Sequence, residues 1–278
     1  WPVSMRLEKM NTHPDNDRAM ILVPIDAHGV DRATFEVLVA LARGLGCGLL
    51  GMILENPRLQ RVAQLPFTTE ILLTGARERE LRSEQVMRHG ESLVREVRRM
   101  LGELAPDHLV SINFEFASGN RLRSALSRAG HLDIFLPRRL RWQTAAERYV
   151  PRSQPVKSIA LILSGRPEDD APVLAATRVV LGQGKAQQVY VFARGRPLPE
   201  LLAPLALPGV RLCVQPELVA EPVALTGLIA RSAYELLILP RVLVALIDAG
   251  VLDQALDTSA GQVLIVSQSG NPASMVCD

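Results

Sequence analysis

The sequence predicts an α/β protein built from two tandem repeats of a doubly wound parallel-sheet domain. Short apolar runs of strand length alternate with segments whose apolar residues recur every three or four positions, as in strands joined by crossover helices. The same order of elements occurs twice, on either side of a stretch that contains two prolines and no apolar period. Right-handed crossovers then imply parallel sheets covered by helices on both faces.

The first copy begins with an apolar run at 19–26, which includes Pro24 and Asp26 and is expected to be a buried strand. A helix is expected over 32–45, because its apolar residues have helical spacing and Gly46 can end it. The remaining expected elements are a strand at 48–56, one long amphipathic helix between 66 and 104, a strand at 109–116, a short helix at 121–129 and a strand at 131–137.

The second copy repeats this order after residue 156. Its strands are expected at 157–165, 187–195, 210–216, 234–240 and 262–268, and its longer helices at 172–181, 223–232 and 242–256. We therefore expect disorder over 1–17, a first domain at 18–140, a linker at 141–156 and a second domain at 157–270.

Composition excludes several classes of protein. The chain has 278 residues with 31 basic and 29 acidic side chains, so its net charge of +2 is too small to attract nucleic acid or an anionic membrane. Three widely spaced cysteines give no disulfide framework and suit a cytoplasmic protein. The longest apolar stretch is interrupted by Pro240, Arg241 and Asp248, so no membrane insertion is expected.

Motifs that would indicate catalysis or metal binding are missing from the sequence. The five histidines show no clustering with one another or with cysteine, so no metal site is expected. No G-x-S-x-G motif occurs, and no catalytic residue is assigned. In folds of this class, ligands bind beyond the carboxyl ends of the strands, so the loops after 26, 119, 137, 164 and 240 are the places to look.

From 19 to 140 and again from 157 to 268, the chain resembles a tandem protein of the universal stress protein family. In the first copy the resemblance rests on the strand that ends in Pro24 and Asp26, and above all on the stretch FEFASGNRLRSALSRAGHLDIFLP at 114–137. The second copy repeats this stretch as VQPELVAEPVALTGLIARSAYELLILP, without a counterpart of the glycine that follows the strand in the first copy. The resemblance implies a Rossmann-like fold of the adenine nucleotide alpha hydrolase type, a role in the stress response and a homodimer.

Family members that bind ATP have an aspartate after the first strand and a glycine-rich phosphate loop after the fourth. Asp26 matches that aspartate, but Ser164 replaces it in the second copy, and neither copy has the glycine pair after its fourth strand. ATP binding is therefore expected to be weak or absent, although ATP or AMP is kept as a candidate ligand. If a small anion or nucleotide binds, the resemblance places Asp26 near a ribose or an amine, Gly119 and Asn120 at the floor, and Arg138 at the anion.

Both copies carry Leu-Pro-Arg where the family's glycine loop would begin. One hypothesis is that Arg138, after Pro137, and Arg241 hold a phosphate or carboxylate with their guanidinium groups; the other is that both arginines face solvent or pair with a loop acid. His28 follows Asp26 by two residues and would be the acid or base of a reaction in that loop.

We therefore expect a non-enzymatic, cytoplasmic stress-response module that binds a small ligand or a partner. The alternatives are a hydrolase or transferase that uses the loop of Asp26 and His28, and a scaffold that regulates a transporter or kinase. The apolar segment at 65–75 is expected to form a lid over the strand ends or to dock on a second subunit, and the last strand to contribute to a homodimer.

Overall fold

The computed structural model describes residues 19–26, 30–55, 61–65, 67–72, 77–80, 83–106, 110–138, 156–193, 199–215, 221–231, 234–259 and 261–267. The expected disordered segment at 1–17, all but one residue of the expected linker at 141–156, and His28 lie outside these residues.

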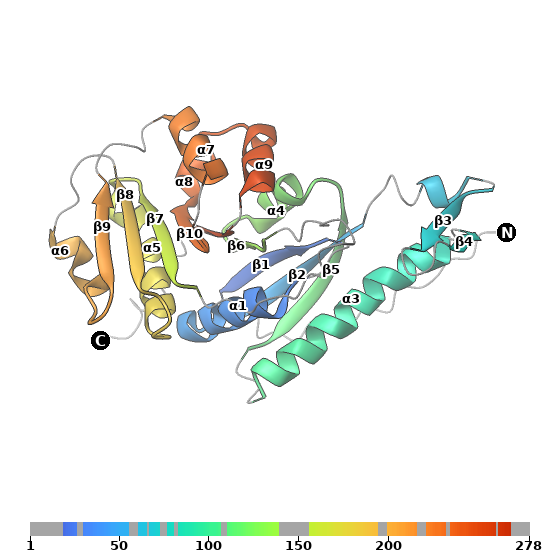
Figure 1. Cartoon of the computed structure of the whole chain (residues 1–278), viewed down its shortest axis with the longest axis horizontal. Helices are drawn as coiled ribbons and strands as arrows, with labels where there is room; N and C mark the ends of the chain where they lie inside the picture. The colour runs from blue at the N-terminus through green and yellow to red at the C-terminus, as the bar shows by residue number, and fades with distance from the viewer. Residues whose placement is uncertain are drawn as a thin grey trace, which may run out of the picture.

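The elements of the first half of the chain alternate as expected, with a small hairpin before the long helix (Figure 1). They are β1 (Met20–Ile25), α1 (Arg32–Leu45), β2 (Gly48–Glu55), β3 (Thr69–Leu72), β4 (Arg77–Glu80), α3 (Ser83–Leu104), β5 (Ile112–Ser118), α4 (Arg121–Ala129) and β6 (Asp133–Leu136).

The second half continues the alternation of strands and helices. Its elements are β7 (Ser158–Leu163), α5 (Pro167–Leu181), β8 (Gln188–Ala193), α6 (Pro199–Leu202), the short 3₁₀ helix η1 (Ala203–Leu205), β9 (Arg211–Gln215), α7 (Pro222–Arg231), β10 (Leu236–Pro240), α8 (Arg241–Val244), α9 (Ala249–Thr258) and β11 (Gln262–Val266).

Nine strands form one sheet in the order β5-β2-β1-β6-β11-β10-β7-β8-β9. Within this sheet the strands of the first half are arranged as β5-β2-β1-β6 and those of the second half as β9-β8-β7-β10, which is the same order. The last strand, β11, lies between β10 and β6. This mostly parallel sheet with helices between its strands confirms the predicted α/β, doubly wound class. The expected domain boundaries at 18–140, 141–156 and 157–270 stay a prediction.

All neighbouring strands of this sheet are parallel except β6 and β11, which run antiparallel. The strand direction therefore reverses in the middle of the sheet. The carboxyl ends of β1, β2, β5 and β6 lie along one edge, here called the first rim. The carboxyl ends of β7, β8, β9, β10 and β11 lie along the opposite edge, here called the second rim.

Helices cover both faces of the sheet and create two apolar layers. On one face, buried side chains of α1, α3 and α5 pack against strands from both halves; on the other face α4, α7, α8 and α9 do so (Figure 1). Alternate residues of each strand point to opposite faces, so both faces of an interior strand must be apolar. In β11, Leu264 belongs to the first layer and Ile265 to the second.

Two element predictions are wrong in detail. The expected single helix between 66 and 104 begins only at Ser83, because Thr69–Leu72 and Arg77–Glu80 pair as an antiparallel hairpin. The sequence RERE alternates with period two, which fits a strand, whereas the helix was inferred from apolar spacing alone. The expected helix at 242–256 is two helices, because the Asp248 side chain caps a new helix by accepting the Gly250 and Val251 N–H groups.

Candidate functional site

The turn from β5 into α4 brings Gly119 and Asn120 to the first rim. Gly119 has a φ of 123°, a backbone conformation that favours glycine. Asn120 begins the helix: its Oδ1 accepts the Arg123 N–H at 3.0 Å, and its Nδ2 donates to Asp253 Oδ2 of α9 at 2.6 Å. The side-chain amide of Asn120 was expected to contact a ligand. Both its oxygen and its nitrogen instead form hydrogen bonds within the protein.

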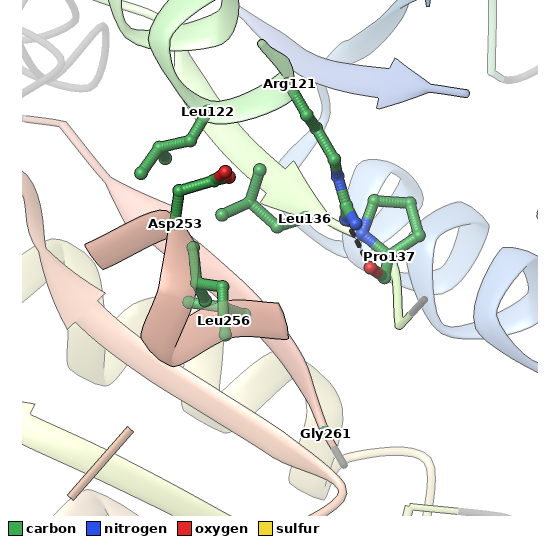
Figure 2. Close-up of a pocket in the computed structure, with 8 residues that line it drawn as sticks. Arg121, Leu122, Leu136, Pro137, Asp253, Leu256 and Gly261 are labelled. Atoms are coloured by element: carbon green, nitrogen blue, oxygen red, sulfur yellow. Dashed lines mark hydrogen bonds between the residues drawn. The ribbon is translucent and has the colours of Figure 1, made fainter. Parts of the chain in front are cut away.

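Beside this turn, the seam between β6 and β11 forms a small pocket under α4 and α9. Figure 2 shows Arg121 reaching over the pocket to donate a hydrogen bond from Nη2 to the Pro137 carbonyl. The remaining lining residues include Leu122, Leu136 and Leu256, and the space they leave is about 10 Å³. That space is about enough for one water molecule.

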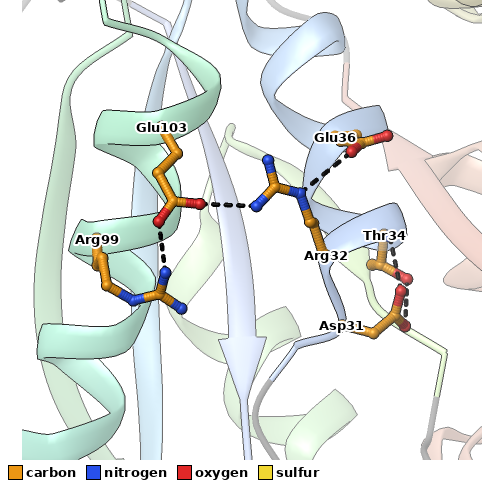
Figure 3. Close-up of polar contacts among 6 residues, drawn as sticks. All are labelled: Asp31, Arg32, Thr34, Glu36, Arg99 and Glu103. Atoms are coloured by element: carbon orange, nitrogen blue, oxygen red, sulfur yellow. Dashed lines mark hydrogen bonds and ion pairs between the residues drawn. The ribbon is translucent and has the colours of Figure 1, made fainter. Parts of the chain in front are cut away.

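An aspartate with a largely covered side chain organises the start of α1 at the same rim. Asp31 Oδ1 accepts the Thr34 N–H at 2.9 Å, and its Oδ2 accepts the Thr34 hydroxyl at 2.8 Å (Figure 3). The Asp31 side chain is 7% exposed and lies 3.9 Å from Arg138 Nη2. Across the sheet, Gln262 Nε2 of β11 donates to Thr34 Oγ1 at 3.1 Å. Arg138 therefore faces a carboxylate of its own chain, as the second of the two arginine hypotheses expects.

An exposed ion network joins α1 to α3 close to this cap (Figure 3). Arg32 bonds to Glu103 Oε2 at 2.7 Å and lies 3.5 Å from Glu36, while Arg99 pairs with the other oxygen of Glu103. The hydrogen bond from Arg32 lowers the pKa of Glu103. Because both arginines are more than half exposed, this network contributes little to stability.

At the second rim, the loop after β7 closes around a carboxylate of the following helix. Asp170 Oδ1 accepts the Ser164 N–H at 2.7 Å and the Ser164 hydroxyl at 2.9 Å, and its Oδ2 accepts the Gly165 N–H at 3.0 Å. Gly165 has a φ of 84°, which turns its amide inward beside that of Ser164. Asp170 is 1% exposed, and burial raises the pKa of its carboxyl group.

Arg241 binds to the end of α4. Its Nη2 donates to the Leu126 carbonyl at 3.0 Å, and its Nη1 donates to the Gly130 carbonyl and lies 3.5 Å from Ser267 Oγ. The last carbonyls of a helix have no partner within it and carry partial negative charge, so a guanidinium group is well suited to this place. Arg241 thus ties the second half to the first.

Replacing Arg241 by methionine is expected to lower the free energy of unfolding by about 1 kcal/mol, because two helix-terminal carbonyls lose a charged donor. Chemical denaturation followed by circular dichroism measures this change. The same substitution at exposed Arg128, whose partner is Glu115 of the neighbouring strand, should have a smaller effect. An effect at Arg128 equal to or larger than that at Arg241 would contradict the proposed helix-capping role.

The nine predicted site residues do not come together in one place. Pro24 is buried within β1, and Asp26 follows the end of that strand at the first rim. The same rim holds Gly119, Asn120, Pro137 and Arg138. Ser164 and Arg241 lie at the opposite, second rim. His28 lies outside the described residues. The structure thus separates the predicted residues into two groups.

Sequence reasoning missed the partners that occupy these positions. Asp31 stands directly before a helix with a threonine three residues later, which is a recognisable N-cap pattern. Asp170 belongs to an acidic run at the start of a helix. The sequence does not indicate which carboxylate of that run binds the preceding loop. Gln262 and Asp253 contact Thr34 and Asn120 across 228 and 133 positions of the chain, so local patterns cannot reveal these pairs.

Two general properties bear on the class of site. Within the residues that the structure describes, no group of three His, Cys, Asp or Glu side chains is placed to hold a metal ion. None of the described helices has both the length and the apolar character needed to cross a bilayer.

Neither protein-family models nor curated proteins give a match to this sequence. Among solved structures, the chain is similar to a protein of unknown function from Pseudomonas aeruginosa PAO1, with a TM-score of 0.45 and 10% identity over 90% of this chain and 92% of that one. It is also similar to a "putative universal stress protein" from Pseudomonas aeruginosa UCBPP-PA14, with a TM-score of 0.43 and 12% identity over 90% of this chain and 93% of that one. The likeness is one of fold.

Proposed function

We propose that the chain is a non-enzymatic, tandem module of the universal stress protein type that acts by binding a partner, with weak or absent ATP binding. A homodimer and a cytoplasmic location belong to the same proposal. The observation that carries it is that side chains of this chain occupy the polar groups at both rims where a nucleotide would be held.

The second rim gives the strongest support. A phosphate entering the loop after β7 would need the two backbone amides and the hydroxyl that now bind Asp170. It would also meet the negative charge of that carboxylate, and like charges at close range repel strongly where solvent is scarce. The loop is therefore better suited to holding its own helix than to holding a nucleotide.

The first rim supports the same conclusion in a different way. Asn120 is bonded to Asp253, Arg121 to the Pro137 carbonyl, and Arg138 lies close to Asp31. The pocket that Arg121, Pro137 and Asp253 help to line has room for about one water molecule. A base and ribose would need a rearrangement of several of these contacts before they could enter.

Thermal unfolding with ATP, ADP, AMP and cyclic nucleotides at millimolar concentration tests the proposal. A ligand present at a hundredfold excess over its Kd stabilises the folded state by about 2.7 kcal/mol, which is readily seen as a rise in Tm. We expect no rise beyond that given by the same concentration of a neutral nucleoside. A nucleotide-specific rise would refute the proposed weak binding, and release of phosphate or ADP would refute the non-enzymatic part.

A variant of Asp170 makes the test sharper. Asp170→Ala removes the resident carboxylate and should make the Tm rise with inorganic phosphate or sulfate relative to chloride, because the freed amides can accept an anion. Glu168→Ala removes the same charge from an exposed position on the same helical turn and should show no such response. Equal anion responses in wild type, Asp170→Ala and Glu168→Ala would show that Asp170 does not close this loop.

A further inference from the structure

The nine-stranded sheet ends in β9, whose outer edge is unpaired among the strands that the structure describes (Figure 1, left). On its inner side, the Arg211 N–H donates to the Gln187 carbonyl beside β8 at 2.8 Å. Because strand residues alternate, the N–H and C=O groups of Leu212 and Val214 point away from β8. Such a row of open backbone groups is a template for another strand.

The side chains of β9 do little to protect this edge. Natural edge strands are commonly shielded by charges, bulges or proline. In β9 the only charged residue is Arg211 at its start, Leu212 and Cys213 are half-buried, and Val214 is 40% exposed. The other edge strand, β5, has Glu115 near its middle, bound by Arg128. The β9 edge is therefore the better candidate for pairing.

The last strand is not available for this purpose. β11 pairs with β10 on one side and with β6 on the other, and its five residues are buried. A homodimer formed through that strand would have to break the middle of the sheet. An edge strand can accept a partner without breaking any contact of the sheet.

We propose that β9 pairs antiparallel with β9 of a second copy of this chain, about a two-fold axis that passes beside Cys213. In this register the open backbone groups of Leu212 face those of Val214 of the second copy, and the reverse, so each such pair exchanges two hydrogen bonds. Arg211 lies opposite Gln215, so no like charges face each other. All five residues of the strand are paired.

The register also places Cys213 opposite its own copy in a non-hydrogen-bonded pair. The Cα atoms of such a pair are about 4.5 Å apart, within the range that a disulfide can bridge. Cys213 is a free thiol in register with Tyr190 of β8. It is therefore a reporter of the contact, because a symmetric pairing shifted along the strand would not set the two thiols against each other. This inference deepens the homodimer of the proposed function and is independent of its ligand.

The register of the β9 pair is tested by treating the full chain, with the substitution Cys277→Ser, with the oxidant diamide. Diamide takes up the two electrons and two protons that two thiols lose when they form a disulfide. We expect a covalent dimer on a non-reducing gel, and its loss with the further change Cys213→Ser. Cys47 serves as an internal control, because burial raises the pKa of its thiol to about 12 and leaves it unreactive. A failure of Cys213 to cross-link would overturn the register.

Light scattering after size-exclusion chromatography tests the interface without a cross-linking reaction. Wild type should elute as a dimer, and Val214→Lys should shift it to a monomer that keeps the circular dichroism of a folded protein, because a lysine on an edge strand blocks pairing. Val223→Lys, at a valine that is 79% exposed on α7, is the matched control and should remain a dimer. A monomeric wild type, or a dimer that survives Val214→Lys, would overturn the proposal. A nucleotide-induced rise in Tm would refute the weak-binding proposal and leave this result unchanged.

Discussion

Replacing Leu264 by alanine is expected to lower the free energy of unfolding by about 3 kcal/mol, within the range for large-to-small changes in a packed core. Leu264 is fully buried in β11, opposite Phe135 of β6 and beside Ile238 of β10. Since β11 joins the strands of the two halves, the cavity weakens the cores of both. We therefore expect the whole described sheet to unfold in one transition at lower denaturant.

Urea denaturation followed by circular dichroism and by hydrogen exchange measures this effect. Exchange would report amides of β1 and of β7 separately, and both should lose protection together. Val251→Ala, at a valine of α9 that is 51% exposed, is the control and should change the stability by less than about 0.5 kcal/mol. Protection lost in only one half would show that β11 does not couple them.

Replacing Asp133 by asparagine is expected to raise the stability at neutral pH by about 1–2 kcal/mol. Burial raises the pKa of Asp133 from 3.8 to about 6, even though its Oδ1 accepts the Ser267 N–H at 2.7 Å. A shift of two pKa units corresponds to about 3 kcal/mol, from which the cost of burying the new amide N–H groups is subtracted. The amide oxygen of asparagine can still accept the bond from Ser267.

The pH dependence has a definite sign. Between about pH 4 and pH 6 the folded protein binds more protons at Asp133 than the unfolded chain does, so the contribution of this group to stability falls as the pH rises. The wild type should lose stability relative to Asp133→Asn across this interval, with no further divergence above about pH 7. Asp133→Ala, which also removes the acceptor for Ser267, should be less stable than Asp133→Asn. A difference between wild type and Asp133→Asn that is constant with pH would refute the shifted titration.

Local pattern was enough to predict most elements of the fold. The strands of the sheet are short apolar runs, and α1 was expected from apolar residues at helical spacing and from Gly46, which ends it. The hairpin before α3 was missed because β4 is fully charged and was counted with the charged face of the helix, while the apolar segment around β3 was expected to be a lid. The break between α8 and α9 was missed because the apolar spacing continues through Asp248.

The candidate sites were harder to predict than the strands. Four of the five predicted loops follow the carboxyl end of a strand, because the fold class fixes that place, whereas α8 begins directly after β10 at Arg241. The sequence could not show that Ser164 and Arg241 lie at the rim opposite Asn120, since this follows from the antiparallel pairing of β6 with β11. Neither could it show that Arg241 binds carbonyls of α4, since the contact is set by how the halves pack.

The reversal at β6 and β11 has a geometric consequence for any complex the molecule forms. Strands of about five residues are on the order of 17 Å long. A ligand or partner at the first rim and another at the second rim would therefore be at least that far apart and would face in opposite directions. Two such molecules could bind at the same time without touching each other. Any communication between them could use the central strands, where the two directions of the sheet meet, or the contacts of α4 with Asp253 and Arg241.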